Sequence, residues 1–187
     1  MDQYAVLLSI ITLSSLIMVL ASKEQKFSME FHKVDCIISN PRVIKRFECF
    51  YEKLGPSRYL SEALFILNQQ LDKTIESHIR IHIGTGGKIV KFLDMRVNVC
   101  DTLKAGISVP ILRKIIALLM ESSNFPRKCP VKANFLYNMS NLIVDDSFFP
   151  KYTPYPMVFN YTTDIYSNQK KIAIIHIEGA LVAKKKK

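Results

Sequence analysis

The feature of this 187-residue chain that most constrains its fold is a stretch in which every second residue faces the same way. From position 75 to 83, isoleucine or serine alternates with charged residues and histidine. A period of two gives an extended strand one apolar face and one polar face. Residues 84–87 contain three glycines, and residues 89–100 then alternate in the same way. The pattern predicts an antiparallel hairpin with one buried face.

Other short apolar runs predict further strands of the same kind. The run at 59–71 is long enough for a helix, but its surroundings favour a buried strand. Proline, glycine and asparagine separate the runs at 40–41, 55–57 and 167–170. Many short strands in one chain predict a mainly β domain, an antiparallel immunoglobulin-like β-sandwich. The predicted strands are 27–38, 46–54, 59–71, 75–83, 89–100, 134–144, 157–166 and 171–182.

One segment changes to a helical period. Apolar residues recur there every three or four positions, with Arg113 and Lys114 on the opposite side. Ser108 is a candidate N-cap, and Pro110 is tolerated in a first turn. We expect one short amphipathic helix that ends near residues 122–124, with an apolar stripe of Val109, Leu112, Ile115, Ile116 and Leu119.

The first residues are typical of a secretory signal peptide. Residues 5–20 carry no charge, and Val19-Leu20-Ala21 offers a cleavage site before a polar stretch. The stretch departs from the usual pattern because no basic residue precedes it and Asp2 is acidic. An uncleaved anchor is the alternative, but the apolar run is shorter than the roughly 20 residues that span a bilayer. We expect a signal peptide at 1–21, one extracellular domain at 22–183 and a basic tail at 184–187.

Cysteines and sequons fit a secreted glycoprotein. Four cysteines, Cys36, Cys49, Cys100 and Cys129, allow three disulfide pairings in an oxidising compartment. The pairs nearest in sequence, 36 with 49 and 100 with 129, are favoured. Asn138 and Asn160 each begin a glycosylation sequon.

The charge of the chain is strongly positive. Its formal net charge is +10, of which the terminal run Lys184–Lys187 supplies 4, so the rest carries +6 (10 − 4). A solvated surface with a basic tail explains this, and attraction to an anionic membrane, a glycan or an acidic receptor is the alternative. Nucleic acid is disfavoured, because no nucleic-acid-binding motif is present and secretion removes the usual targets.

Motifs for catalysis and metal binding are lacking. His78 and His82 share one face of a strand but lie about 13 Å apart, which is too far for one ion. The cysteines form no Cys-x-x-Cys pair, and no nucleophile elbow is present. Asp145 and Asp146 precede Phe148-Phe149-Pro150 and are expected to top a turn. We therefore expect no catalytic residues, no metal site, no cofactor and no enzymatic activity.

Several short blocks resemble a family of small secreted insect proteins. They are Val34-Asp35-Cys36, Phe47-Glu48-Cys49-Phe50-Tyr51, Val99-Cys100-Asp101, Val109-Pro110-Ile111-Leu112, Ser122-Ser123-Asn124-Phe125, Cys129-Pro130, Asn141-Leu142 and Glu178-Gly179. In order and spacing they are similar to the domain of unknown function 1091, near the chemosensory protein B group. The sequence departs from the pattern in having no tryptophan and in carrying Pro154 and Pro156 where a glycine-bearing turn is expected.

The resemblance implies a sandwich like the ML and ganglioside-activator lipid-recognition domains, in which two sheets hold an acyl chain or sterol. The expected function is then a secreted binding protein for a lipid or other hydrophobic ligand, in insect chemosensation. The alternative is a secreted interaction protein with a filled core that acts through its basic surface on a receptor, glycan or membrane. The candidate ligand-binding residues are Phe65, Leu67, Ile79, Ile81, Leu93, Met95, Leu112, Ile116 and Phe159.

Overall fold

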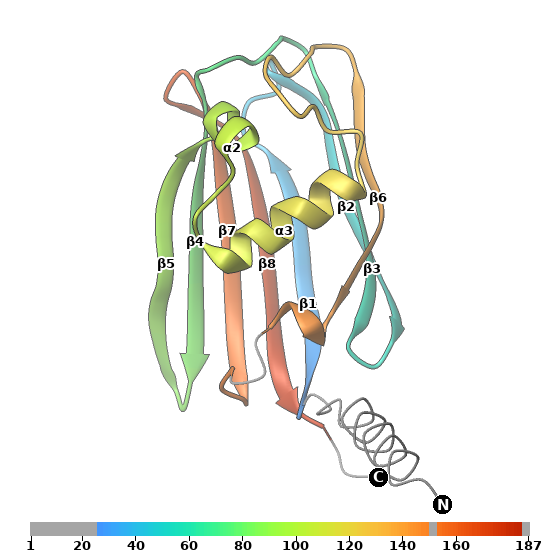
Figure 1. Cartoon of the computed structure of the whole chain (residues 1–187), viewed down its shortest axis with the longest axis vertical. Coiled ribbons are helices and arrows are strands. Elements are labelled where there is room, and N and C mark those ends of the chain that lie inside the picture. Colours follow the sequence, from blue (N-terminus) through green and yellow to red (C-terminus); the bar gives the residue numbers. More distant parts are fainter. Residues whose placement is uncertain (1–25, 150–152, 185–187) are drawn as a thin grey trace, which may run out of the picture.

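A computed structural model describes residues 26–149 and 153–184 of the chain. The described part is mainly β, with two antiparallel sheets that form a sandwich, as the alternating patterns predict (Figure 1). The strands are β1 (Phe27–Ile38), β2 (Ile44–Gly55), β3 (Arg58–Leu67), β4 (Ile75–Thr85), β5 (Lys88–Asn98), β6 (Leu136–Asp145), β7 (Met157–Ser167) and β8 (Lys170–Ala183).

The two sheets differ in width. The larger sheet has the strand order β1-β8-β7-β4-β5, and the smaller sheet has the order β2-β3-β6. The hairpin predicted from the isoleucine alternation is β4–β5, in which Ile79 pairs with Met95. Asn168 and Gln169 turn β7 into β8 with positive φ angles of 50° and 62°, as a tight hairpin of this hand requires.

Strand β3 is shorter than the sequence predicts. It ends at Leu67 because the chain then turns away, and Leu71 forms an isolated bridge with Val131 instead of continuing the strand. Leu71 is buried by this loop contact. Because a buried loop residue is as apolar as a buried strand residue, the sequence predicts a longer strand than the structure contains.

Two apolar clusters join the sheets, one at each end of the sandwich. Leu67, Tyr137 and Ile172 belong to the first, the upper core cluster, which includes residues of both sheets. Phe27 and Tyr59 belong to the second, the lower core cluster, which likewise includes both sheets. Strands β1 and β2 meet at one side of the sandwich, where the disulfide Cys36–Cys49 crosses from the larger sheet to the smaller with Cα atoms 5.5 Å apart.

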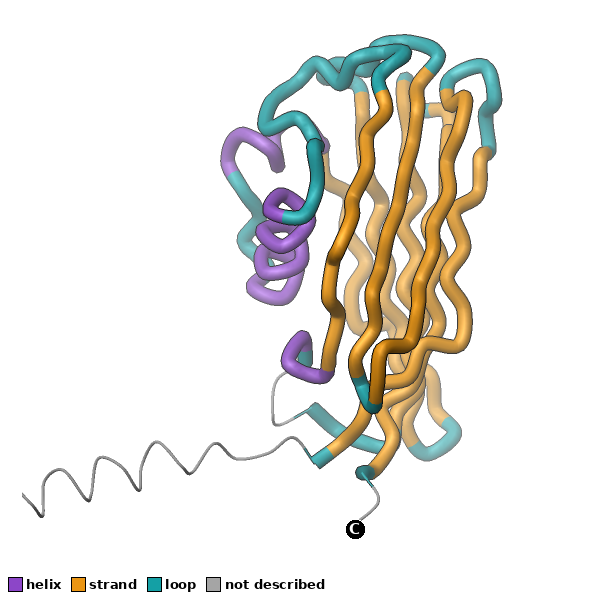
Figure 2. Tube along the Cα trace, turned by 90° about the vertical axis from the view of Figure 1, so that its right-hand side faces the viewer, coloured by secondary structure: helices purple, strands orange, loops and turns teal. Residues whose placement is uncertain are grey.

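The helical content exceeds the single helix expected. The predicted helix is α3 (Pro110–Glu121), but its N-cap is Val109 rather than Ser108, and no side chain caps it. A second helix, α2 (Val99–Ala105), occupies the end of the predicted strand 89–100. A 3-10 turn, η1, covers Asp146–Phe148. Figure 2 shows the helices together on one side of the strands.

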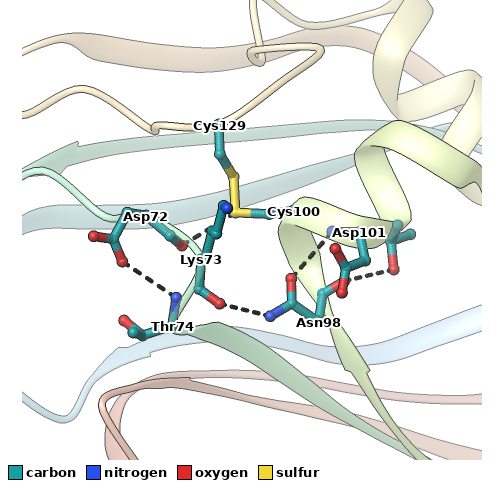
Figure 3. The surroundings of a disulfide bond; sticks show 8 residues. Asp72, Lys73, Thr74, Asn98, Cys100, Asp101 and Cys129 are labelled. Atoms are coloured by element: carbon teal, nitrogen blue, oxygen red, sulfur yellow. Dashed lines mark hydrogen bonds between the residues drawn. A yellow bond between two sulfur atoms is a disulfide. The ribbon is translucent and has the colours of Figure 1, made fainter.

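Local hydrogen bonds explain why the alternation does not continue into residues 99 and 100 (Figure 3). Asn98 caps α2, because its Oδ1 accepts from the amide of Asp101 at 3.1 Å. The Asn98 Nδ2 donates to Lys73 O at 2.6 Å, which fastens the helix start to the loop before β4. The disulfide Cys100–Cys129, with Cα atoms 5.6 Å apart, then ties the same turn to the loop before β6.

Both of the favoured cysteine pairs, the pairs nearest in sequence, are therefore disulfide-bonded. Two disulfides are typical of an oxidising compartment. The predicted signal peptide at 1–21 and the last three lysines of the tail lie outside the described residues. Within 26–149 and 153–184, no helix is both long and apolar enough to cross a membrane.

Candidate functional site

The middle of β4 and β5 is covered by α3 rather than by the smaller sheet. The apolar cluster beneath the helix includes residues of β4, β5, β7, α3 and the loop before α3, and none of β2, β3 or β6. Figure 1 shows α3 lying across the strands of the larger sheet. We call this surface the helix-covered face. Its members are Ile79, Leu93, Met95, Val97, Ile107, Val109, Leu112, Ile115, Ile116 and Tyr161.

The helix reaches this face through its helical period. Leu112, Ile115 and Ile116 lie three or four positions apart, so they share one side of the helix. Leu112 is 3% exposed, while Ile115 and Ile116 remain half-buried. From the opposite side, Lys114 Nζ donates to Ser147 O at 2.7 Å and lies 5.2 Å from the centre of the Phe148 ring. The helix is thus held over the sheet mainly by apolar contacts.

One polar pair lies on this otherwise apolar face. The Thr163 hydroxyl donates to Tyr161 Oη at 2.6 Å, and the two residues lie two apart on β7. Burial raises the pKa of the Tyr161 hydroxyl, and the hydrogen bond from Thr163 partly opposes this. The hydroxyl is therefore neutral at physiological pH. A neutral hydroxyl within an apolar surface can orient the polar end of a ligand.

The apolar face continues beyond the helix toward the β4–β5 turn. Val90 pairs with Ile83, which packs on the lower core cluster, so Val90 lies on the same inner face. Val90 is nevertheless 54% exposed. Its neighbours Ile89 and Phe92 are 75% and 59% exposed. Val90 is therefore uncovered apolar surface next to the helix-covered face, whereas Ile89, which pairs with Gly84, lies on the opposite face of the sheet.

The nine candidate ligand-binding residues do not form one group. Five of them, on β4, β5 and α3, share the helix-covered face, and Ile81 lies beside them because it pairs with Leu93 and Tyr161. Phe159 packs in the lower core cluster, and Phe65 and Leu67 belong to the upper one. The five are Ile79, Leu93, Met95, Leu112 and Ile116.

The polar pair is the part of this site that sequence reasoning missed. Tyr161 and Thr163 alternate with Asn160, Thr162 and Asp164 on β7, so the period of two places the pair on the inner face. A tyrosine on the apolar side of a strand is a usable signal, because its hydroxyl needs a partner when it is buried.

Two open hollows lie elsewhere on the surface. One, of about 410 Å³, is lined by residues 28–30 and 53–57. The other, of about 730 Å³, lies between the end of α3 and β6, with Asn124, Asn138 and Ser140 in its wall. None of the nine candidate residues lines either hollow.

The outer face of the larger sheet is polar and contains a buried carboxylate. Asp164 is 3% exposed, and its Oδ2 accepts from Arg80 Nη2 at 2.6 Å. Lys171 Nζ lies 3.1 Å from Oδ1 but outside hydrogen-bond alignment. Arg80 and Lys171 are each about one third exposed, so water screens both cations. This triad joins three neighbouring strands.

Two histidines on this face are paired with carboxylates. His78 contacts Asp94 at 2.6 Å, and His176 contacts Glu178 at 2.7 Å. Their side chains are 19% and 21% exposed, so neighbouring residues cover most of both rings. In the part of the chain that the structure describes, no three histidine, cysteine, aspartate or glutamate side chains are grouped closely enough to hold a metal ion.

The two sequons differ in accessibility. Asn138 is exposed on β6, at the edge of the 730 Å³ hollow. Asn160 is half-buried on β7, where its Oδ1 accepts from the Thr162 hydroxyl at 3.2 Å. Asn138 is therefore the more accessible of the two sequon asparagines.

Comparison with known proteins identifies a domain class but no activity. Residues 77–156 match the family described as "Protein of unknown function (DUF1091)", so a DUF1091 domain is present in this part of the chain. The matched segment contains β5, α2, α3, β6 and most of β4, which includes most of the helix-covered face.

The matches outside this family are weaker. No curated protein matches the sequence. Among solved structures, the chain is similar to a protein from Archaeoglobus fulgidus at 12% identity, with 77% of this chain and 99% of that chain covered. The TM-score of 0.26 is too low for that likeness to carry an argument about function.

Proposed function

We propose that this chain is a secreted binding protein for a lipid or other apolar ligand, and that the ligand lies between α3 and the larger sheet. The observation that carries the proposal is that α3 and the loop before it, and not the smaller sheet, cover the middle of β4 and β5. Leu93, Met95 and Ile116 are left half-buried there. Burial of an acyl chain against such side chains contributes about 0.8 kcal/mol per CH₂ group.

The charge and the polar pair suit an amphiphilic ligand. The Tyr161 hydroxyl offers one hydrogen bond to a polar head group, and the net charge of +10 favours an anionic one. The sequence blocks that resemble the DUF1091 and chemosensory protein B group imply an ML-type sandwich, and this implication favours the same class of ligand. Of the nine candidate residues, the five on the helix-covered face, together with Ile81, form the proposed site, whereas Phe65, Leu67 and Phe159 serve the core.

The absence of tryptophan from the sequence makes a direct test possible. An Ile116→Trp variant carries a single tryptophan under α3, and Ala117→Trp places it at an exposed position of the same helix. We expect oleate or palmitate to shift the emission of Ile116→Trp saturably and to leave that of Ala117→Trp unchanged. Native mass spectrometry of protein secreted from eukaryotic cells is expected to detect a co-purified lipid.

A second pair of variants tests the role of the hydroxyl. Tyr161→Phe keeps the packing and removes one hydrogen bond, so we expect several-fold weaker fatty-acid binding. Tyr166→Phe, on the outer face of the same strand, is the matched control. If Ile116→Trp does not respond and no lipid co-purifies, the ligand-binding proposal is rejected, and a surface-acting interaction protein with a filled core is the better description.

A further inference from the structure

The two sheets have four edge strands, and three of them are covered. β1 and β2 lie together and are joined by the disulfide Cys36–Cys49. The free side of β6 is bonded to the segment after α3, through Ser140 N to Ser122 O at 2.9 Å and Asn124 N to Asn138 O at 3.1 Å. β1 and β2 therefore shield each other, and the segment after α3 covers the β6 edge at residues 138–140.

The fourth edge, β5, is open. Its only strand neighbour is β4, and within residues 26–149 and 153–184 no other segment makes a backbone hydrogen bond to residues 88–97. This strand also carries the largely exposed apolar residues Ile89, Val90 and Phe92. A long edge strand with exposed apolar side chains is a template for pairing with another strand.

A bulge sets which side chains of β5 share a face. Lys91 pairs with His82, and Leu93 pairs with the preceding residue, Ile81, so Phe92 is the extra residue. Lys91 and Asp94 therefore lie on the same outer face, as the 2.8 Å distance from Lys91 Nζ to Asp94 Oδ2 also requires. Val90 and Met95 both lie on the inner face, because their partners Ile83 and Ile79 do.

We propose that β5 pairs antiparallel with β5 of a second copy, with Lys91 of each copy opposite Asp94 of the other. This register matches faces on both sides of the sheet: Lys91 meets Asp94 on the outer face, and Val90 meets Met95 on the inner face. Opposite charges across a strand pair attract, and apolar cross-strand pairs bury surface. A shift by one residue would set inner-face residues against outer-face residues, so the bulge selects this register.

The pairing joins the two larger sheets into one continuous sheet. The exposed Val90 of each copy is then covered next to the helix-covered face of the other copy. The proposal does not rest on ligand binding, since it follows from the open edge, the bulge and the charges. Because a single strand pair buries little surface, the association is weak and depends on concentration.

Sedimentation equilibrium of the full secreted chain at physiological salt is the first measurement. We expect a monomer–dimer equilibrium with a dissociation constant between about 1 µM and 1 mM. Salt at this concentration screens the repulsion between the two positively charged copies beyond about 8 Å. Hydrogen exchange of the same samples is expected to slow at the amides of residues 88–97 as the dimer forms. A monomer across this range, or protection elsewhere only, overturns the proposal.

Charge reversal tests the register. Lys91→Glu sets two carboxylates opposite each other in a homodimer, and Asp94→Lys sets two ammonium groups opposite each other, so each variant alone is expected to lose at least tenfold in dimer affinity. When the two variants are mixed, the carboxylate introduced at position 91 faces the ammonium group introduced at position 94. The native Asp94 of the first variant also faces the native Lys91 of the second, so a heterodimer is expected to form.

Two controls accompany the charge reversals. Circular dichroism checks that both variants are folded. Lys170→Glu, at the start of β8 and separated from β5 by two strands, is expected to dimerise normally. Dimers of either single variant as tight as those of the wild type, or no heterodimer from two folded variants, would contradict the register.

Discussion

The ring of Phe159 lies directly against the backbone of Gly179, its cross-strand partner on β8. A Cβ atom at Gly179 would overlap the ring and would also lie 2.5 Å from Glu30 O on the neighbouring strand β1. The close approach of three strands at this point requires glycine, because a carbonyl oxygen in a ladder cannot move aside as a side chain can.

Replacement of Gly179 is expected to destabilise the sandwich. Gly179→Ala should lower the free energy of unfolding by about 3 kcal/mol, as overpacking of a tight core does, and urea denaturation measures this. Gly55→Ala is the matched control, because nothing lies within 4 Å of a Cβ there and its φ is not positive. Phe159→Leu combined with Gly179→Ala should recover only part of the loss, since Glu30 O remains in place. Equal stability of Gly179→Ala and the wild type would contradict the packing.

The buried Asp164 predicts a second stability effect. Asp164→Asn keeps the shape but leaves Arg80 and Lys171 without their shared carboxylate. Both cations reach water, so we expect a loss of about 1–3 kcal/mol in thermal or urea unfolding rather than the larger cost of a fully buried pair. Asp35→Asn, at a more exposed pair with Lys33, should have a clearly smaller effect, because water screens that pair. Equal effects of the two substitutions would argue against a special role of burial at Asp164.

Acid should weaken the outer face of the larger sheet. Hydrogen bonds from Lys91 and then His78 lower the pKa of Asp94 to about 2, and a hydrogen bond from His176 lowers the pKa of Glu178. A carboxylate whose pKa is lower in the folded state stabilises the fold above its unfolded pKa, near about 4. That contribution is lost as the pH falls from about 4 through about 2. Unfolding free energies of Asp94→Asn should therefore decline less steeply over this window than those of the wild type, and parallel curves would refute the assignment.

The cap of α2 can be tested at Asn98. Asn98→Ala removes the acceptor for Asp101 N and the donor to Lys73 O, so we expect a loss of about 1–2 kcal/mol in chemical denaturation. Asn98→Asp keeps the cap oxygen and loses only the donor, so its loss should be intermediate. If Asn98→Asp is as unstable as Asn98→Ala, the contact to Lys73 and not the cap is the important one.

The two α-helices differ in how well the sequence predicts them. The stripe on α3 is readable because its apolar positions recur every three or four residues, whereas α2 is seven residues long and has no buried residue. Such a short helix depends on its cap and on the disulfide at Cys100, so hydropathy alone cannot reveal it. The sequence does carry a cap signal, Asn98 with Asp101 three residues later, but the alternation that precedes it favours a strand up to residue 100.

Part of the candidate site can likewise be predicted from the sequence, and part cannot. Alternation predicts that Ile79, Leu93 and Met95 face inward, whereas Phe65 and Leu67 lie in a continuous apolar run that predicts a buried strand. An inward-facing residue has the same pattern whether a strand or a helix covers it, so only the structure separates the helix-covered face from the core.

The sequence by itself determined the class of fold, the β4–β5 and β7–β8 hairpins and which faces of β4 and β5 are apolar, because these follow from local periodicity and turn residues. Only the tertiary structure decided which strands share a sheet, that α3 rather than a strand covers the middle of β4 and β5, and that β5 is the edge left open. Those outcomes depend on contacts between residues far apart in the chain, and no local pattern of side chains encodes them.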